Sequence, residues 1–201
     1  TAIFTVGNAT LNVNVTAQNV TVEQNTTFII DVVDFNGNVS ISVDGDVLYN
    51  GTVKGIIGAT KLLAGDKVAT VVFYGDDNYD ELTLNNVRFT VSRVTPEISV
   101  VVDDVTYPAK ALATITVGNK ANGTVNITVD GKKFKGTVTN GVGTIDLEGL
   151  SAGAKVASVE FFSTDDYSNN VTASAKFNIN KNEFNIILWL FLNISLISSI
   201  V

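Results

Sequence analysis

The 201-residue sequence contains no histidine, no cysteine and no methionine. Without histidine and cysteine, the chain lacks the usual general base near neutral pH, the thiolate nucleophile and most transition-metal ligands. A zinc or iron site is therefore not expected, and a disulfide framework is excluded. The serines, lysines and carboxylates form no recognisable catalytic constellation. We expect a protein that is not an enzyme and that has no cofactor.

Positive charge is also scarce, because 13 lysines and arginines stand against 20 aspartates and glutamates, for a net charge of −7. Nucleic-acid binding needs clustered basic residues, so no nucleic-acid partner is expected. The chain does not begin with methionine, and no basic segment followed by an apolar one opens it. These features indicate a processed chain or a piece of a longer one, and we favour the piece.

The chain repeats itself. The stretch "VSISVDG" at 39–45 returns as "VNITVDG" at 125–131, and "LLAGDKVATVVFYGDDNY" at 62–79 returns as "LSAGAKVASVEFFSTDDY" at 150–167. "FTV" at 4–6 also matches 89–91, which indicates the end of an earlier copy. The predicted organisation is the end of a preceding repeat at 1–9, a repeat at 10–91, a linker at 92–97, a second repeat at 98–180 and a hydrophobic tail at 181–201.

Apolar residues within each repeat alternate with polar ones, as Val39, Ile41 and Val43 do. This period of two predicts strands with one buried face and one wet face. The turn signals between the strands are Asp44-Gly45, Asn50-Gly51, Ala64-Gly65, Asp130-Gly131, Asn140-Gly141 and Ala152-Gly153. About seven short strands per repeat, with no helix-length segment, predict an all-β chain of two tandem antiparallel Greek-key β-sandwiches.

The second half of the first repeat, "LLAGDKVATVVFYGDDNYDELTLNNVRFTV", resembles the Ig-like repeats of adhesin-like surface proteins from methanogenic archaea and related bacterial arrays. The matching positions are Leu63, Ala64, Gly65, Tyr74, Gly75, Asp76, Tyr79 and Phe89, and in the second copy Leu150, Ala152, Gly153, Phe162, Tyr167 and Phe177. The second copy departs from the pattern at Ser163 and Thr164. The resemblance implies Ig-like sandwiches with a role in extracellular, non-enzymatic surface display, and it names no ligand.

The acidic stretch "YGDDNYDE" at 74–81 is a candidate metal site, because Asp76, Asn78 and Asp80 have the 1-3-5 spacing that opens a calcium-binding loop. At an offset of 88, however, the same positions in the second copy are Thr164, Asp166 and Ser168. We therefore interpret the stretch as a structural corner and expect no metal, with a weak calcium site as the alternative. In this interpretation, Asp77 and Asp165 bond turn amides, and Tyr79 and Tyr167 pack beneath the loop.

Asn-x-Ser/Thr sequons are more frequent than composition alone predicts, which favours a secreted, glycan-bearing protein. The candidate glycosylation sites are Asn14, Asn19, Asn25, Asn38, Asn50, Asn122, Asn126 and Asn170, and further sequons start at Asn8 and Asn193.

The last 18 residues, "FNIILWLFLNISLISSIV" at 184–201, carry no charge. As a helix they would almost span a bilayer, so they are a candidate membrane anchor. Polar residues inside the stretch and the lack of a following basic cluster weaken that interpretation. A frayed chain end or a packed hydrophobic segment are the alternatives.

Together these patterns predict a non-enzymatic cell-surface adhesin-like protein, with Ig-like modules acting as a stalk or as an adhesion and display segment. The expected location is extracellular, at the cell surface, with the tail as the candidate anchor. The expected partners are neighbouring Ig-like repeats and a cell-surface glycan or protein. The alternative function is a carbohydrate- or protein-binding module, including an accessory part of a secreted enzyme.

Overall fold

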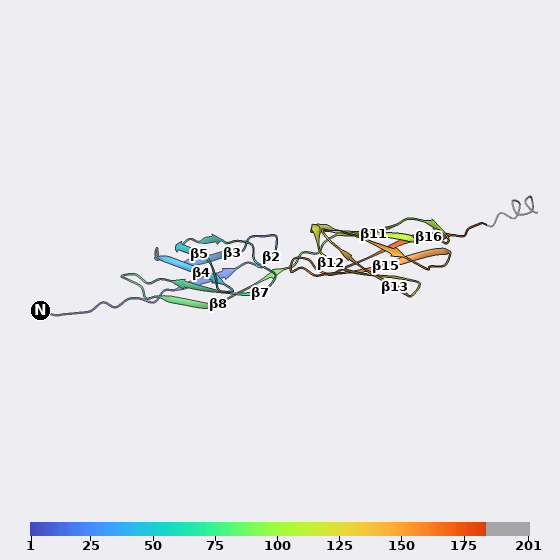
Figure 1. Ribbon diagram of the computed structural model, residues 1–201. Helices are drawn as coiled ribbons and strands as arrows, with labels where there is room; N and C mark the ends of the chain where they lie inside the picture. Colours follow the sequence, from blue (N-terminus) through green and yellow to red (C-terminus); the bar gives the residue numbers. More distant parts are fainter. Residues whose placement is uncertain (184–201) are drawn as a thin grey trace, which may run out of the picture. The chain divides into compact units, whose positions relative to one another are not determined.

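The alternating segments form the strands that the sequence predicts, and these strands group into two units (Figure 1). The structure is a computed structural model and describes residues 1–183. Unit 1 contains Thr1–Thr95 together with Asp165–Asn169. Unit 2 contains Pro96–Thr164 and the described residues from Asn170 onward.

Eight strands make up the sandwich of unit 1. They are β1 (Val13–Ala17), β2 (Val20–Thr21), β3 (Thr27–Val32), β4 (Asn38–Val43), β5 (Asp46–Thr52), β6 (Ile56–Gly58), β7 (Gly65–Phe73) and β8 (Leu82–Ser92). One sheet has the order β1-β3-β6, and the other has the order β2-β8-β7-β4-β5. All neighbours are antiparallel except β2 and β8, which are parallel.

Unit 2 repeats this plan strand for strand. Its elements are β9 (Ile98–Val102), β10 (Val105–Thr106), β11 (Ala111–Val117), the 3₁₀ turn η1 (Gly118–Lys120), β12 (Gly123–Val129), β13 (Lys132–Val138), β14 (Val142–Leu147), β15 (Gly153–Ser163) and β16 (Val171–Asn180). The sheets have the orders β9-β11-β14 and β10-β16-β15-β12-β13, and β10 is parallel to β16. Each unit is an Ig-like Greek-key β-sandwich.

The two cores contain the residues that the alternation places on the inner faces. Val39, Ile41 and Val43 are at most 2% exposed, and Phe89 and Phe177 are 4% and 3% exposed. Burial of these side chains between two sheets is the main stabilising contribution to such a fold.

The Asp-Gly turns form as predicted. Asp44-Gly45 joins β4 to β5 with φ values of 53° and 92°, and Asp130-Gly131 joins β12 to β13 with 49° and 79°. Positive φ at both central residues is the requirement of a type I′ turn. Asn140-Gly141 has the same geometry, with 50° and 83°, and joins β13 to β14.

The turn prediction for Asn50-Gly51 is wrong, because both residues lie inside β5, where they pair with Ser40 and Val39. The Asp44-Gly45 turn already reverses the chain, so the strand continues through Asn50 and Gly51 to pair the rest of β4. The sequence also predicts about seven strands per repeat where the structure has eight. β2 and β10 have two residues each, too short for a period of two to reveal them.

Within residues 1–183, no helix combines the length and apolar character needed to cross a bilayer. The candidate anchor at 184–201 and the sequon at Asn193 lie outside the described residues.

Candidate functional site

The acidic stretch forms a tight corner between β7 and β8. Oδ1 of Asp76 accepts hydrogen bonds from the backbone N–H groups of Asn78 and Tyr79, at 2.8 Å and 2.9 Å. The Tyr79 ring packs edge-on against Phe35, with centroids 6.1 Å apart. A side-chain oxygen that bonds amides two and three residues ahead closes a turn without help from a metal.

The corner prediction is confirmed for Asp165 and Tyr79 but is wrong for Asp77 and Tyr167. In the first copy Asp76, not Asp77, bonds the turn amides. In the second copy Asp165 bonds the amides of Tyr167 and Ser168, at 3.0 Å and 2.8 Å. The matching acids are therefore 89 residues apart, not 88.

This shift also changes which residues pack beneath the loop. Tyr79 corresponds to Ser168, which is fully buried, while Tyr167 is 37% exposed and does not pack inward as predicted. The corner loop is longer in the second copy than in the first. In the first copy, a register shift in the pairing of β7 with β8, between Ala69 and Val71, compensates for this difference, so Phe89 and Phe177 are again 88 residues apart.

Each corner also pairs with one residue from another part of the chain. Ala9 donates its N–H to the Asn78 carbonyl at 2.8 Å and accepts from the N–H of Asp80 at 3.0 Å. Val94 makes the same pair of bonds with Tyr167 and Asn169. Ala9 lies just before β1, so the corner fixes the segment that enters the sandwich.

This geometry bears on the calcium hypothesis. One carboxylate oxygen of Asp76 is already occupied by two backbone amides. Within residues 1–183, no group of three or more aspartates and glutamates is placed to hold a metal ion. The corner has a structural role in both copies. That it binds no metal stays a prediction, with weak calcium binding by Asp76, Asn78 and Asp80 as the alternative.

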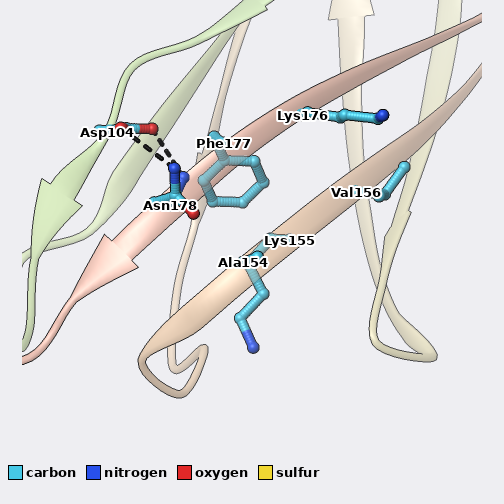
Figure 2. Close-up of a pocket in the computed structure, with 7 residues that line it drawn as sticks. All are labelled: Asp104, Ala154, Lys155, Val156, Lys176, Phe177 and Asn178. Atoms are coloured by element: carbon cyan, nitrogen blue, oxygen red, sulfur yellow. Dashed lines mark hydrogen bonds between the residues drawn. The ribbon is translucent and has the colours of Figure 1, made fainter.

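A shallow hollow of about 610 Å³ lies over the ends of β15 and β16 in unit 2 (Figure 2). It is lined by Asp104, Ala154, Lys155, Val156, Lys176, Phe177 and Asn178. Figure 2 shows the side chains of Lys155 and Lys176 pointing away from each other, so their charges do not converge on a common ligand position. Unit 1 has the matching hollow, lined by Asn19, Asp66, Lys67, Val68, Arg88, Phe89 and Thr90.

One side chain in each hollow caps the last strand of its sandwich. Oδ1 of Asp104 accepts from the backbone N–H of Asn178 at 2.6 Å, and Oδ1 of Asn19 accepts from that of Thr90 at 2.7 Å. Both residues stand just before the short parallel strand, where the chain passes from one sheet to the other. The contact satisfies a backbone donor that no strand reaches at that point.

A lysine in each unit reaches the Asp-Gly turn. Lys67 lies 2.6 Å from Asp44, and Lys155 lies 2.6 Å from Asp130. Neither the two ion pairs nor the two caps were among the features predicted from the sequence. The signal was present, because the lysines lie in the repeated "AGDKVA" and "AGAKVA" stretches and the aspartates lie in the repeated turns.

The structure places seven of the eight candidate glycosylation asparagines in exposed positions and leaves Asn126 half-buried. Three of them have a structural role, because Oδ1 of Asn19, Asn122 and Asn170 accepts a backbone hydrogen bond. The sequons at Asn14, Asn25, Asn38 and Asn50 are exposed in unit 1. Their modification stays a prediction.

No protein-family model and no curated protein sequence matches the chain. The fibronectin(III)-like modules of CbhA from Clostridium thermocellum share 14% identity over 85% of this chain and 95% of that one, with a TM-score of 0.33. The Yersinia pseudotuberculosis adhesin InvE shares 12% over 84% of this chain and 60% of that one, with a TM-score of 0.42.

SGBP-B of the Bacteroides ovatus mixed-linkage glucan utilization locus, in complex with a mixed-linkage heptasaccharide, shares 16% identity. The match covers 80% of this chain and 42% of SGBP-B, with a TM-score of 0.33. At such identities the likeness reaches no further than the fold.

Proposed function

We propose that the chain is a segment of a non-enzymatic, adhesin-like cell-surface protein, whose Ig-like modules act as a stalk or as an adhesion and display segment. The observation that carries the proposal is the set of contacts that both sequence repeats share. These are the lysine–aspartate pair at the turn, the side-chain cap on the last strand and the corner that binds an incoming residue.

All three shared contacts fasten the sandwich or its entering segment, and none of them lines a convergent ligand site. The outer surfaces differ between the copies, as at Asp66 and Ala154 in the two hollows. Repeats that keep the same internal contacts but differ in their surface residues suit a spacer or a display scaffold. Neighbouring repeats are then its first partners, and a cell-surface glycan or protein is the external one.

The exposed sequons of unit 1 support an extracellular location, and the tail at 184–201 is the proposed anchor. The test is labelling of intact source cells with antibodies raised against this chain, followed by brief protease treatment. We expect labelling without permeabilisation and its loss after the protease, while a cytoplasmic marker stays unlabelled and intact. Labelling only in permeabilised cells would overturn the proposal.

A carbohydrate-binding role is the second candidate, and one observation favours it. A hollow of about 450 Å³ in unit 2 is lined by Tyr107, Gly149, Leu150, Ser151 and Ala152. Tyr107 is 51% exposed and offers a ring on which a sugar can stack. Binding on a glycan array that disappears in Tyr107→Ala, with unchanged thermal unfolding, would favour this function over the stalk.

A further inference from the structure

The outer face of the sheet β1-β3-β6 in unit 1 carries two neighbouring isoleucines. Ile29 on β3 and Ile56 on β6 lie opposite each other in the antiparallel pairing, and they are 39% and 68% exposed. The residues next to them in the chain, Phe28 and Ile57, belong to the core and are at most 3% exposed. Because side chains alternate between the two faces of a sheet, both isoleucines stand on the solvent side and form one apolar patch.

Asn14 lies on the same face, beside the isoleucine pair. Thr16 on β1 pairs with Ile29, so one row across the sheet contains Thr16, Ile29 and Ile56. Asn14 pairs with Asp31 and occupies the next row. Diagonal neighbours on one face of a sheet are about 7–8 Å apart, which is the expected spacing of Asn14 and Ile29. The next strand, β6, lies about 5 Å further across the sheet.

Asn14 is also the first residue of an Asn-Val-Thr sequon that ends at Thr16. Both residues are exposed, and β1 is an outermost strand of its sheet. Within residues 1–183 the Asn14 amide makes no hydrogen bond, whereas three other sequon asparagines use their side-chain oxygen to accept one. Asn14 is therefore accessible for modification, and a group attached to it would stand on the face that holds the isoleucines.

The corresponding face of unit 2 has neither feature. Thr114 and Thr144 hold the places of the two isoleucines, and Ser99 holds the place of the sequon asparagine. Val101 and Leu112 are exposed on this face, but each pairs with a polar residue and they do not lie opposite each other. The isoleucine pair and the adjacent sequon thus occur together in one repeat and are both absent from the other.

A glycan is a suitable cover for such a patch. An N-linked glycan is bulky and hydrated on its outer side, and the C–H groups of its sugar rings can lie against apolar side chains. Contact of this kind removes apolar surface from water, which is favourable. A glycan on Asn14 is held beside the patch by its covalent bond, so no association step opposes the contact.

We propose that Asn14 is an N-glycosylation site and that its glycan covers Ile29 and Ile56. The glycan would keep this face of unit 1 hydrated, as Thr114 and Thr144 do for unit 2. The inference rests on the proposed extracellular function, because N-linked glycans are attached to secreted chains.

Hydroxyl-radical footprinting of the full chain tests the cover directly. The parent chain and its Asn14→Gln variant are made in the same N-glycosylating host. We expect a glycan at Asn14 by peptide mass, and several-fold slower oxidation of Ile29 and Ile56 in the parent than in the variant. Val47, which is 64% exposed on the other sheet of unit 1, should oxidise equally in both chains and is the internal control.

Thermal unfolding tests whether the glycan acts through the isoleucines. In the glycosylated chain, Asn14→Gln should lower the unfolding temperature by about 2–4 °C. It should have little effect in chains made without glycans, or in the background Ile29→Thr, Ile56→Thr, which carries the residues of unit 2. Asn25→Gln removes another exposed sequon, just before β3, and should leave the oxidation of both isoleucines unchanged.

Three outcomes would overturn the proposal. These are an unmodified Asn14, equal oxidation of the isoleucines in the parent and in Asn14→Gln, and an equal fall in unfolding temperature in the threonine background. The last would mean that the glycan stabilises the chain without the isoleucines.

Peptide mass of the chain isolated from its source cells separates this inference from the proposed function. Surface-labelled cells whose chain has no glycan at Asn14 would overturn the inference and leave the proposed function standing. Cells that label only after permeabilisation would overturn the proposed function. The footprint of chain made in the glycosylating host would then still decide whether a glycan on Asn14 covers the isoleucines.

Discussion

The Nζ atom of Lys155 lies 2.6 Å from Oδ2 of Asp130, and the lysine side chain is only 7% exposed. Lys67 and Asp44 repeat this relationship in unit 1, with the lysine 11% exposed. In each unit, an almost buried ammonium on the strand that follows the Ala-Gly turn neutralises the aspartate of the type I′ turn. The pair therefore ties the turn at one end of the sheet to a neighbouring strand.

Removal of the negative charge from Asp130 should destabilise unit 2. Asp130→Asn keeps a residue that tolerates the positive φ of 49° but removes the carboxylate charge, so the Lys155 ammonium has only neutral acceptors, such as the Ser151 hydroxyl at 3.1 Å. We expect a loss of about 1–2 kcal/mol in the free energy of unfolding, measured by chemical denaturation.

Lys155→Met is the matched control, because it removes the charge and keeps the apolar stem. It should cost less than Asp130→Asn, since no unpaired ammonium remains. An equal loss in the two variants would mean that the unpaired charge is not the cause.

The cap on β16 should protect one backbone amide. In Asp104→Ala, the N–H of Asn178 loses the acceptor that lies 2.6 Å away. We expect that amide to exchange faster with solvent and the stability to fall by about 1 kcal/mol, as measured by hydrogen exchange and denaturation.

Asp104→Asn should behave like the parent chain, because Asn19 performs the same function in unit 1 with an amide oxygen. If Asp104→Asn exchanged as fast as Asp104→Ala, the negative charge rather than the hydrogen bond would be responsible.

The pair Lys110 and Glu148 should titrate away from the usual values. The hydrogen bond from Lys110, followed by its charge, lowers the pKa of Glu148, and the same bond raises the pKa of Lys110. An NMR titration should show the Glu148 carboxyl below its ordinary range, with a return toward that range in Lys110→Met. An unchanged Glu148 titration in Lys110→Met would contradict this assignment.

The sign of the resulting stability follows from these directions. Because the folded pKa of Glu148 is lowered, its contribution is present above the unfolded pKa and is lost as the pH falls through the folded pKa. Because the folded pKa of Lys110 is raised, its contribution is present below the unfolded pKa and is lost as the pH rises through the folded pKa. Both groups are exposed, so the effect on overall stability should be small.

The sequence predicted the strands and most turns because both have strong local causes. Alternation decides which face of β4 is buried, and positive φ decides where Asp44-Gly45 reverses the chain. Asn50-Gly51 carries the same local signal but lies within a strand. There, the pairing of β5 along the full length of β4 outweighs the local preference of Asn-Gly for a turn.

The corner was misaligned for a different reason. Comparison at a constant offset assumes that insertions are absent, and here the longer loop of the second copy is offset by an irregularity in the pairing of β7 with β8. The two changes cancel before Phe89 and Phe177, so the residues on either side of the loop keep the same offset and do not reveal the misalignment within it. Only the hydrogen bonds to Asp76 and Asp165 identify the corresponding residues.

Close packing over two glycines was also outside the reach of the sequence. A Cβ on Gly37 would lie 2.4 Å from the Phe35 ring, and one on Gly123 would lie 2.3 Å from the Phe162 carbonyl oxygen and 2.5 Å from the Phe161 ring. The ring comes from the loop between β3 and β4 in unit 1 and from β15 in unit 2, so the two repeats share no sequence pattern that predicts this contact. Both positions therefore require glycine, but the atoms that would clash with a Cβ are different in the two units.

The corner itself supplies the last prediction. Asp76→Ala removes the acceptor of two backbone N–H groups, so the turn that presents the Asn78 carbonyl to Ala9 should loosen. We expect faster exchange of the Ala9 and Tyr79 amides and a loss of about 1–2 kcal/mol. The Asp77 carboxylate makes no hydrogen bond or ion pair with the described part of the chain. Asp77→Ala should therefore change little.

Calcium distinguishes the two roles of this loop. If the corner is held by its own hydrogen bonds, millimolar Ca²⁺ should leave the unfolding temperature of the parent chain unchanged. A rise in that temperature with Ca²⁺, lost in both Asp76→Ala and Asp80→Ala, would show that the ion binds there. Asp80→Ala is the sharper variant, because Asp80 contributes to the corner through its backbone N–H and the substitution leaves that group in place.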